Sequence, residues 1–336
     1  MTHLGGNIEG LGNYAFARSR EHARTIKQML ARGAAAQSEV VASWDRCVRL
    51  HKLDPEGDCP EIVASRYELQ EEAAAVECYI RMADRELNSL TKQLAKLGFF
   101  VSVASVNGIA ITHRGNVPDL GASKTKTSDG MCWRENAQGT NAIGTTLYSQ
   151  RPTVIYQSEH FYSANSLMTC LATPLFGPTG ALLGALNATT VDRRVDRGLA
   201  TVLLSLLVGS AQKMEGVWFR DDYPESLVIS IPEVTSISGS SAMLAVDPDL
   251  NVLGATQAAR THCGITGDAM ARGVHLDQID TGARLAAPSL PDAERTTLKR
   301  ALALSGQNVS VAATRLGISR TTMHRKMAAF KLLRGR

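Results

Sequence analysis

The chain has 336 residues, and because 44% of them are hydrophobic it can bury sizeable cores, which excludes a generally disordered protein. The longest apolar run is too short to span a bilayer, and the N-terminus lacks a basic stretch followed by an apolar one, so neither a membrane protein nor a secreted one is expected. The net charge of +4 divides unevenly: residues 293–336 carry ten Lys or Arg against one acid, whereas the preceding 292 residues carry 26 basic and 31 acidic ones.

The cysteines and histidines give no sign of a metal or cofactor site. The six cysteines stand at positions 47, 59, 78, 132, 170 and 263 without a CxxC pair, and the eight histidines are scattered. We therefore expect reduced thiols in a cytoplasmic protein, with no bound metal and no cofactor.

The first hundred residues have a helical pattern. Residues 14–53 form one helical stretch, which Asp54-Pro55 ends, and a second runs from about Glu61 to Leu97 with leucines at intervals of three and four. We interpret 1–80 as an N-terminal helical region.

From residue 99 the pattern changes to strands. Strands are expected at 99–106, 109–115, 152–157, 169–177 and 181–190, before a helix at 194–218. The first two strands flank an Asn-Gly turn, which indicates a β-hairpin. Helices on both sides of antiparallel strands predict an α+β domain over 81–220. The apolar face of the helix at 194–218 packs on this sheet or pairs two subunits.

A smaller α+β module is expected at 236–282. A linker at 224–240 precedes it, and two strands and a short Ala-rich helix follow one another within it. The fold class is therefore α+β multidomain with an all-α tail.

The basic tail, 292–336, has the pattern of three short helices. Asp292 can cap the first, 310–316 form the second, and Gly317 supplies a turn before Ser319, which caps the third. On the third helix Met323, Met327 and Phe330 share the inner side. The outward and flanking positions hold Arg320, Thr321, Thr322, His324, Arg325 and Lys326. This pattern predicts a recognition helix for duplex DNA, and the alternative is a solvated basic helix in an ordinary three-helix cap.

At "NVSVAATRLGISRTTMHRKMAAFKL" (308–332) the tail resembles the Fis-type helix-turn-helix of bacterial transcriptional regulators. In that family the start of the last helix enters the major groove, and its Arg and Lys residues contact bases and backbone. The resemblance implies DNA contacts by Ser319, Arg320, Thr322, Arg325 and Lys326, with Asn308 and Ser310 near phosphates. His324 stands where the family often has Tyr or a basic residue.

The body also resembles a known family, the acetoin-regulator (AcoR-type) proteins. The resemblance rests on "SWDRCVRLHKLDP" (43–55), "CWRENAQGTNAIGTTL" (132–147), "EHF" (159–161) and "CLATPLFGPTGALLGALNATT" (170–190). It runs from about residue 39 to 218 and implies a GAF-like sensor domain, an antiparallel sheet with flanking helices. The module at 236–282 resembles a PAS domain more faintly.

The chain departs from that family in one respect. Full-length members place an AAA+ ATPase between sensor and DNA reader, whereas here only about eighty residues separate the two regions, without a GxxxxGK[ST] loop. The resemblance therefore implies sensing and DNA binding without ATP-driven activation of a sigma factor.

A ligand of the sensor domain is expected between one sheet face and the segments that cover it. The loop 130–145 and the stretch 157–170 bring aromatic and polar residues together. The candidate ligand-binding residues are Trp133, Asn136, Thr140, Asn141, Glu159, His160, Phe161 and Cys170. The alternative is structural: the polar groups of "GTNAIGT" bond their own backbone, Trp133 is core, and Cys170 is a small buried hydrophobe.

These features predict a cytoplasmic, homodimeric transcriptional regulator, not an enzyme, which senses a small-molecule effector and binds double-stranded DNA at a palindromic operator. Two alternatives stay open. A Fis-like architectural protein would bind DNA without sensing a ligand. A GAF-fold methionine sulfoxide reductase would use cysteines near its pocket, with Cys132 and Cys170 as candidates.

Overall fold

The computed structural model describes residues 6–33, 38–116, 128–231, 242–279, 290–330 and 332. The chain divides into two compact units, Met1–Asp280 and Thr281–Arg336, and each is described by itself. Within the described ranges no helix combines the length and the apolar character that a bilayer span requires. Asp292, the expected cap of the first tail helix, lies outside the described side chains.

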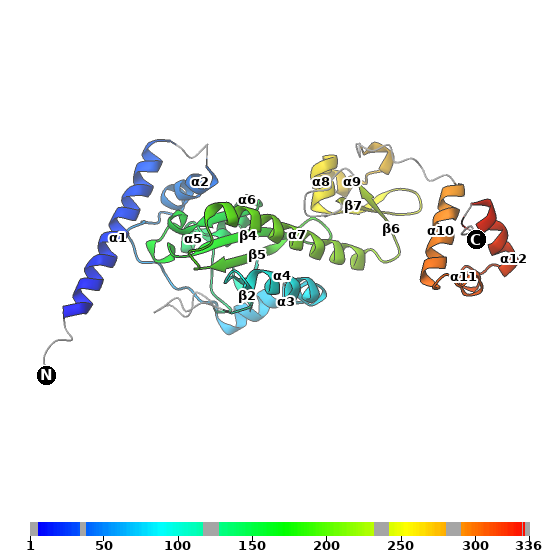
Figure 1. Ribbon diagram of the computed structural model, residues 1–336. Helices are drawn as coiled ribbons and strands as arrows, with labels where there is room; N and C mark the ends of the chain where they lie inside the picture. Colours follow the sequence, from blue (N-terminus) through cyan, green and yellow to red (C-terminus); the bar gives the residue numbers. More distant parts are fainter. Residues whose placement is uncertain are drawn as a thin grey trace. The chain divides into compact units, whose positions relative to one another are not determined.

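The first unit contains helices and two antiparallel sheets (Figure 1). Its helices are α1 (Gly6–Ala31), α2 (Glu39–Asp45), α3 (Arg66–Met82), α4 (Asp84–Ala95), α5 (Glu135–Gln138), α6 (Ala142–Ser149), α7 (Arg197–Asp222), α8 (Gln257–Cys263) and α9 (Gly267–Arg272). Its strands are β1 (Phe100–Ser105), β2 (Ala110–Arg114), β3 (Thr153–Tyr156), β4 (Thr169–Phe176), β5 (Leu182–Thr190), β6 (Leu227–Ile231), β7 (Ala242–Val246) and β8 (Val252–Ala255).

The larger sheet has the strand order β2-β1-β5-β4-β3, with every neighbouring pair antiparallel. The sequence pattern predicted all of these strands. Gly108, with a φ of +72°, makes the turn between β1 and β2, a backbone conformation that few residues other than glycine adopt readily. The antiparallel α+β architecture is thereby confirmed for this part of the chain.

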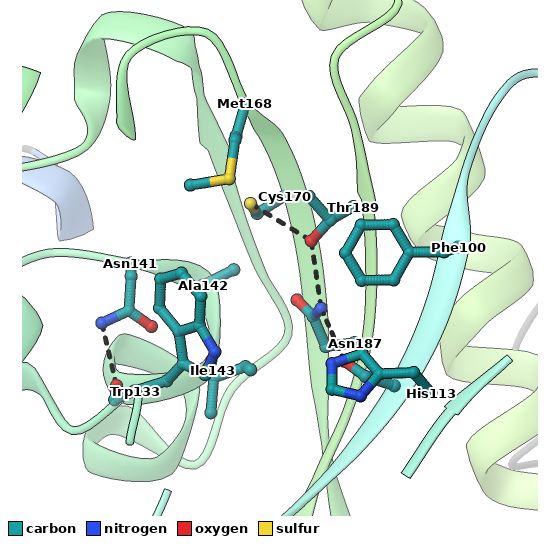
Figure 2. A pocket seen from close by; sticks show the side chains of 11 residues that line it. Phe100, His113, Trp133, Asn141, Ala142, Ile143, Met168, Cys170, Asn187 and Thr189 are labelled. Atoms are coloured by element: carbon teal, nitrogen blue, oxygen red, sulfur yellow. Dashed lines mark hydrogen bonds between the residues drawn. The ribbon is translucent and has the colours of Figure 1, made fainter. Parts of the chain in front are cut away.

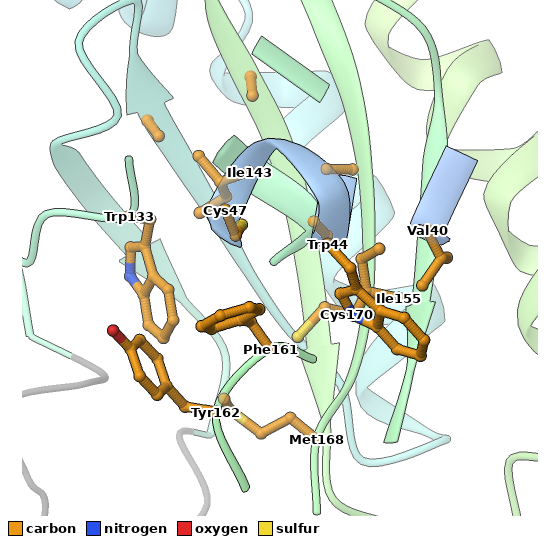
Figure 3. Close-up of a cluster of buried hydrophobic side chains, with 14 of the residues drawn as sticks. Val40, Trp44, Cys47, Trp133, Ile143, Ile155, Phe161, Tyr162, Met168 and Cys170 are labelled. Atoms are coloured by element: carbon orange, nitrogen blue, oxygen red, sulfur yellow. The ribbon is translucent and has the colours of Figure 1, made fainter. Parts of the chain in front are cut away.

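Side chains along each strand of the larger sheet point alternately to its two faces, and a separate apolar core packs on each face. Leu171 and Leu186 point to the face covered by α4 and α7, where Leu87, Leu90 and Leu94 of α4 join them. The neighbours Cys170 and Ala185 point to the other face, where α2, α6 and the aromatic residues Trp44, Trp133, Phe161 and Tyr162 cover them (Figure 3). The second face carries more polar side chains, and the candidate ligand residues lie there.

Helix α7 contributes to both sheets of the first unit. Its middle packs on β4, and near its end Phe219 joins Met243 and Ala245 of β7 in a small apolar cluster. The smaller sheet has the order β6-β7-β8. β6 lies within the stretch expected to be a linker. It is an edge strand with Leu227 exposed, so its side chains lack the strict apolar alternation by which a strand is recognised.

Two further expectations differ from the structure. The segment 130–145, expected to be a loop, contains α5 and the start of α6. The side chain of Asn141 caps α6 by accepting a hydrogen bond from the Gly144 amide. The helical stretch expected from Glu61 to Leu97 is two helices, α3 and α4, which meet at Ala83. The short helices α5 and α6 complete too few turns to show an apolar period in the sequence.

The second unit contains α10 (Leu290–Leu304), α11 (Val309–Arg315) and α12 (Arg320–Ala329). Leu298 and Leu302 of α10, Ala312 and Ala313 of α11, and Met323 and Met327 of α12 form its core. The small alanines let α11 approach its neighbours closely. Gly317, with a φ of +63°, makes the turn into α12. The three-helix tail and its inward methionines are as predicted.

Candidate ligand cavity and nucleic-acid interface

A small cavity lies on the polar face of the larger sheet (Figure 2). Its volume is about 20 Å³, room for roughly one water molecule. It is lined by Phe100, Ser102, His113, Trp133, Asn141, Ala142, Ile143, Met168, Cys170, Asn187 and Thr189. Of the predicted ligand residues, the cavity brings together Trp133, Asn141 and Cys170.

On β1, β4 and β5 the cavity wall is a chain of neutral hydrogen bonds, and on β2 it is His113, whose Nδ1 lies 2.6 Å from Asp129 Oδ1. The Asn187 Nδ2 group donates to Ser102 Oγ over 3.0 Å and to Thr189 Oγ1 over 3.1 Å, and Thr189 Oγ1 donates to Cys170 Sγ over 3.3 Å. All four side chains are buried. Ser102, Asn187 and Thr189 were not predicted from the sequence. The available signal was that Asn187 and Thr189 alternate with the apolar Leu186 and Ala188 along one strand.

Cys170 is poorly suited to thiolate chemistry. Burial raises the pKa of its thiol to about 12, even though Thr189 donates a hydrogen bond to the sulfur. A thiol with such a pKa stays protonated at neutral pH, and the thiolate is the nucleophilic form.

The cover of the cavity is held by the side chain of Asn141. Its Nδ2 group donates to Trp133 O over 2.9 Å and to Gly139 O over 2.8 Å, and its Oδ1 accepts from Gly144 N over 2.9 Å. Gly144 leaves no room for a larger residue, because a Cβ there would lie 2.6 Å from both Glu135 N and Trp133 O. Asn141 therefore shapes the cover, the role that the structural alternative gave it.

Thr140 belongs to a buried polar network beneath this cover. Its Oγ1 lies 2.7 Å from Ser43 Oγ, which also donates to Glu135 Oε2 over 2.8 Å. The Arg46 guanidinium holds the same carboxylate with two hydrogen bonds, of 2.7 and 3.0 Å. The side chain of Glu135 is only 4% exposed and that of Arg46 15%. That Ser43, Arg46 and Glu135 form one group was not predicted from the sequence.

This network joins two stretches that are far apart in the sequence. Ser43 and Arg46 belong to 43–55, and Glu135 and Thr140 belong to 132–147. Both stretches carry the resemblance to the acetoin-regulator family. Their contact gives that shared pattern a structural reason, since a buried ion pair needs both partners in place.

The other candidate ligand residues lie apart from the small cavity. Phe161 is fully buried in the core, and the backbone oxygen of the buried His160 accepts from His22 Nε2 of α1 over 2.9 Å. Asn136 is exposed on α5. Glu159 pairs with Arg197 and lines a separate cleft of about 680 Å³ beside α1.

The third helix of the tail presents polar and basic side chains to solvent. Arg320, Thr321, His324 and Arg325 are exposed, opposite the buried Met323 and Met327. Thr322 and Lys326 are half-buried: Thr322 shares a hydrogen bond with Ser319, and Lys326 pairs with Glu294 of α10. In the described part of the tail, Lys326 is the one cation with an acidic partner.

Two of the predicted DNA-contacting residues also have structural roles. Asn308 Oδ1 accepts from the amides of Ser310 and Val311 at the start of α11. Ser319 Oγ accepts from Thr322 N over 3.1 Å at the start of α12. Such caps satisfy backbone donors that the first turn of a helix leaves unpaired. Ser310 is exposed on α11 beside the first cap.

The described ranges hold no candidate metal site. No group of three or more His, Cys, Asp or Glu side chains there could hold an ion.

Two family models match the chain. Residues 17–213 match the family described as "MimR, N-terminal domain", and 289–330 match the family described as "Bacterial regulatory protein, Fis family". The first match spans more than half of the chain and includes the cavity and the Arg46–Glu135 network. The second spans the three helices of the tail.

Curated relatives and a solved structure agree with these matches. The chain is 26% identical over 259 residues to the acetoin catabolism regulatory protein of Cupriavidus necator, covering 72% of this chain and 38% of that protein. It is 27% identical over 165 residues to the acetoin dehydrogenase operon transcriptional activator AcoR of Bacillus subtilis, covering 49% of this chain and 27% of that protein. The chain thus spans well under half the length of these relatives.

Among solved structures, the crystal structure of the E. coli DhaR(N)–DhaL complex is similar, with a TM-score of 0.50 and 17% identity. The match covers 78% of this chain and 86% of that one. At this identity the likeness concerns the fold alone.

Proposed function

The chain belongs to the family of the MimR N-terminal domain, and from that premise we propose that it is a DNA-binding transcriptional regulator with a ligand-sensing domain. The observation that carries the proposal is the exposed basic surface of α12 on a Fis-type helix-turn-helix in the same chain. Curated relatives over these regions are transcriptional regulators.

The proposed DNA contact has two parts. Arg325 and Thr321, exposed near the start and middle of α12, read base edges in the major groove. Exposed cations around the helices contact phosphates: Arg295, Lys299, Arg300, Arg315 and Arg320. Lys326 stays on Glu294 and orients α12 rather than reading a base.

Binding as a homodimer to a palindromic operator is part of the proposal. One three-helix domain contacts a single half-site. Two such domains bound about one DNA turn apart (~34 Å) give higher affinity and specificity than one. Activation through an ATPase is not part of it, since about eighty residues between the sensor and the reader hold no phosphate-binding loop.

The effector that we propose is a small uncharged molecule with hydroxyl or carbonyl groups. The sheet side of the small cavity offers Ser102, Asn187 and Thr189, all neutral hydrogen-bonding groups. The cavity is small, so a ligand must be compact or must displace Met168 or Trp133. The names of the relatives connect them with acetoin, a molecule of this class.

A quantitative DNA-binding titration tests the regulator proposal. The full chain should bind duplex DNA with an affinity that falls steeply as salt rises, because bound phosphates release counterions. The same titration with acetoin present tests the sensor part: a change in affinity is expected, and Asn187→Leu should abolish the change while leaving DNA binding in place. Binding that does not depend on salt would contradict the proposal, and binding indifferent to small molecules would favour the Fis-like architectural protein.

The reductase alternative receives less support. The pKa of Cys170 lies at about 12, so the required thiolate is scarce at neutral pH. Reduction of free methionine sulfoxide at the expense of a thiol reductant, lost in Cys170→Ser, would revive it.

A further inference from the structure

A second, larger cavity lies away from the sensor cavity, within the first unit. Its volume is about 390 Å³. Three elements wall it: the end of β4 with Pro174 and Phe176, the middle of α7 with Val208 and Ala211, and α8. The Arg260 side chain of α8 lies against the β4–β5 turn, where a Cβ added at Gly180 would lie 2.5 Å from Arg260 Nε. The cavity is an open groove between these elements.

One acidic side chain faces this cavity without a counter-charge. Glu215 of α7 is half-buried, and its Oε1 accepts a hydrogen bond of 2.9 Å from the Phe176 amide. Among the residues that the structure describes, no Lys, Arg or His forms an ion pair with this carboxyl group. Burial raises its pKa to about 8, so the group is mainly protonated at neutral pH and has a proton to donate from its second oxygen.

The rest of the lining is neutral or apolar. Pro152, Pro174, Val208, Ala211 and Ala258 supply apolar surface, and Thr173 and Thr261 supply hydroxyl groups. His262, exposed on α8, is the other titratable residue of the lining. A lining of this kind favours a ligand that is mostly apolar, with one polar group placed against the buried acid.

We propose that this cavity binds a compact uncharged molecule whose carbonyl or hydroxyl oxygen accepts a hydrogen bond from the Glu215 carboxyl. The bound molecule touches β4, α7 and α8 at once. It therefore stabilises the packing of the smaller module, through α8, on the sensor sheet. This site is separate from the sensor cavity, and its existence does not depend on DNA binding.

Two probes of nearly equal size test the proposal on the full chain. Cyclohexanone carries an uncharged oxygen acceptor, and cyclohexylammonium carries a cation. Saturation-transfer NMR of each probe, titrated with protein, measures binding. Cyclohexanone should bind saturably and the ammonium ion should bind more weakly. Absence of saturable cyclohexanone binding overturns the proposal.

Three variants locate the binding. Glu215→Gln keeps an acceptor for the Phe176 amide and a donor for the ligand, so cyclohexanone binding should change little. Glu215→Leu removes the donor and should weaken binding roughly tenfold. Ala258→Phe fills the cavity from α8 and should abolish binding. A thermal unfolding scan checks that each variant folds. If Glu215→Leu does not fold, Ala258→Phe alone tests the site.

The same measurements also distinguish an uncharged ligand from a cation. Cyclohexanone binding that is unchanged in both Glu215→Leu and Ala258→Phe places the probe elsewhere and overturns the proposal. Stronger binding of the ammonium ion, lost in Glu215→Gln, shows that the carboxyl acts as an anion and overturns the uncharged class.

Discussion

The tail and the sensor domain use polar side chains in opposite ways. On α12 the polar and basic residues Arg320, Thr321 and Arg325 are exposed, with no ion pair among the described residues. In the sensor domain Glu135, Thr140 and Asn141 are buried, and other protein groups occupy their hydrogen-bonding atoms. The difference teaches that the exposed polar groups of α12 are free to contact DNA, whereas Glu135, Thr140 and Asn141 hold the cover of the small cavity in place.

The largest expected effect is on the stability of the sensor domain. Glu135→Gln removes the buried anion of the Arg46 guanidinium and leaves it only Glu39, at 3.9 Å, so the free energy of unfolding should fall by about 3 kcal/mol. Urea unfolding followed by tryptophan fluorescence measures it. The exposed pair of Lys27 and Glu56 supplies the control, because Glu56→Gln should leave the midpoint almost unchanged. Equal losses in the two variants would remove the distinction between the regions.

On α12 a substitution should weaken DNA binding and leave the stability unchanged. Arg325→Ala should weaken binding to a specific operator by about 1–3 kcal/mol if the side chain reads a base, with the stability of the tail unchanged. Arg85→Ala, an exposed arginine of α4, removes the same charge and should have no effect. An equal loss on operator and on random-sequence DNA would make Arg325 a phosphate contact instead.

Ser319 tests the comparison between the two regions, because it is a tail residue whose side chain has a structural role. Its hydroxyl caps α12, so Ser319→Ala should lower the stability of the three-helix tail by about 1 kcal/mol. Ser319→Asp keeps a capping acceptor and should restore the stability, while its negative charge weakens DNA binding. Circular dichroism and a DNA titration on the same samples separate the two effects. A stable Ser319→Ala variant with weakened DNA binding would assign the hydroxyl to DNA alone.

A further prediction concerns the pH dependence of stability. Because the pKa of Glu215 is raised from 4.5 to about 8, the folded protein keeps a proton that the unfolded chain releases in this interval. Stability from this group is therefore complete below pH 4.5 and declines as pH rises toward about 8. The wild type should lose stability relative to Glu215→Gln between about pH 5 and about pH 9, as urea unfolding would show. A constant difference across that range would contradict a raised pKa.

The sequence predicted the elements that have a clear period. The strands from 99 to 190, the helix at 194–218 and the inward Met323 and Met327 were all recognisable, because apolar residues recur at strand or helix spacing. The short helices α5 and α6 were missed, since a capping Asn and two glycines have no apolar period.

The candidate site was predicted less completely, for a physical reason. Trp133, Asn141 and Cys170 line the small cavity, but the other lining residues Asn187 and Ser102 come from strands that pair only in the fold. The Arg46–Glu135 ion pair joins residues 89 positions apart, and a single sequence carries no sign of which distant acid meets which arginine. Glu215 is likewise one of many acids until its burial is known.

The central claim is that α12 places this chain on duplex DNA. Selection of bound sequences from a pool of random duplexes, with the full chain as bait, tests it most directly. We predict enrichment of a motif with two related half-sites, which disappears when Arg320→Ala and Arg325→Ala are combined. A pool that remains random, or the same motif enriched by the double variant, would contradict the claim.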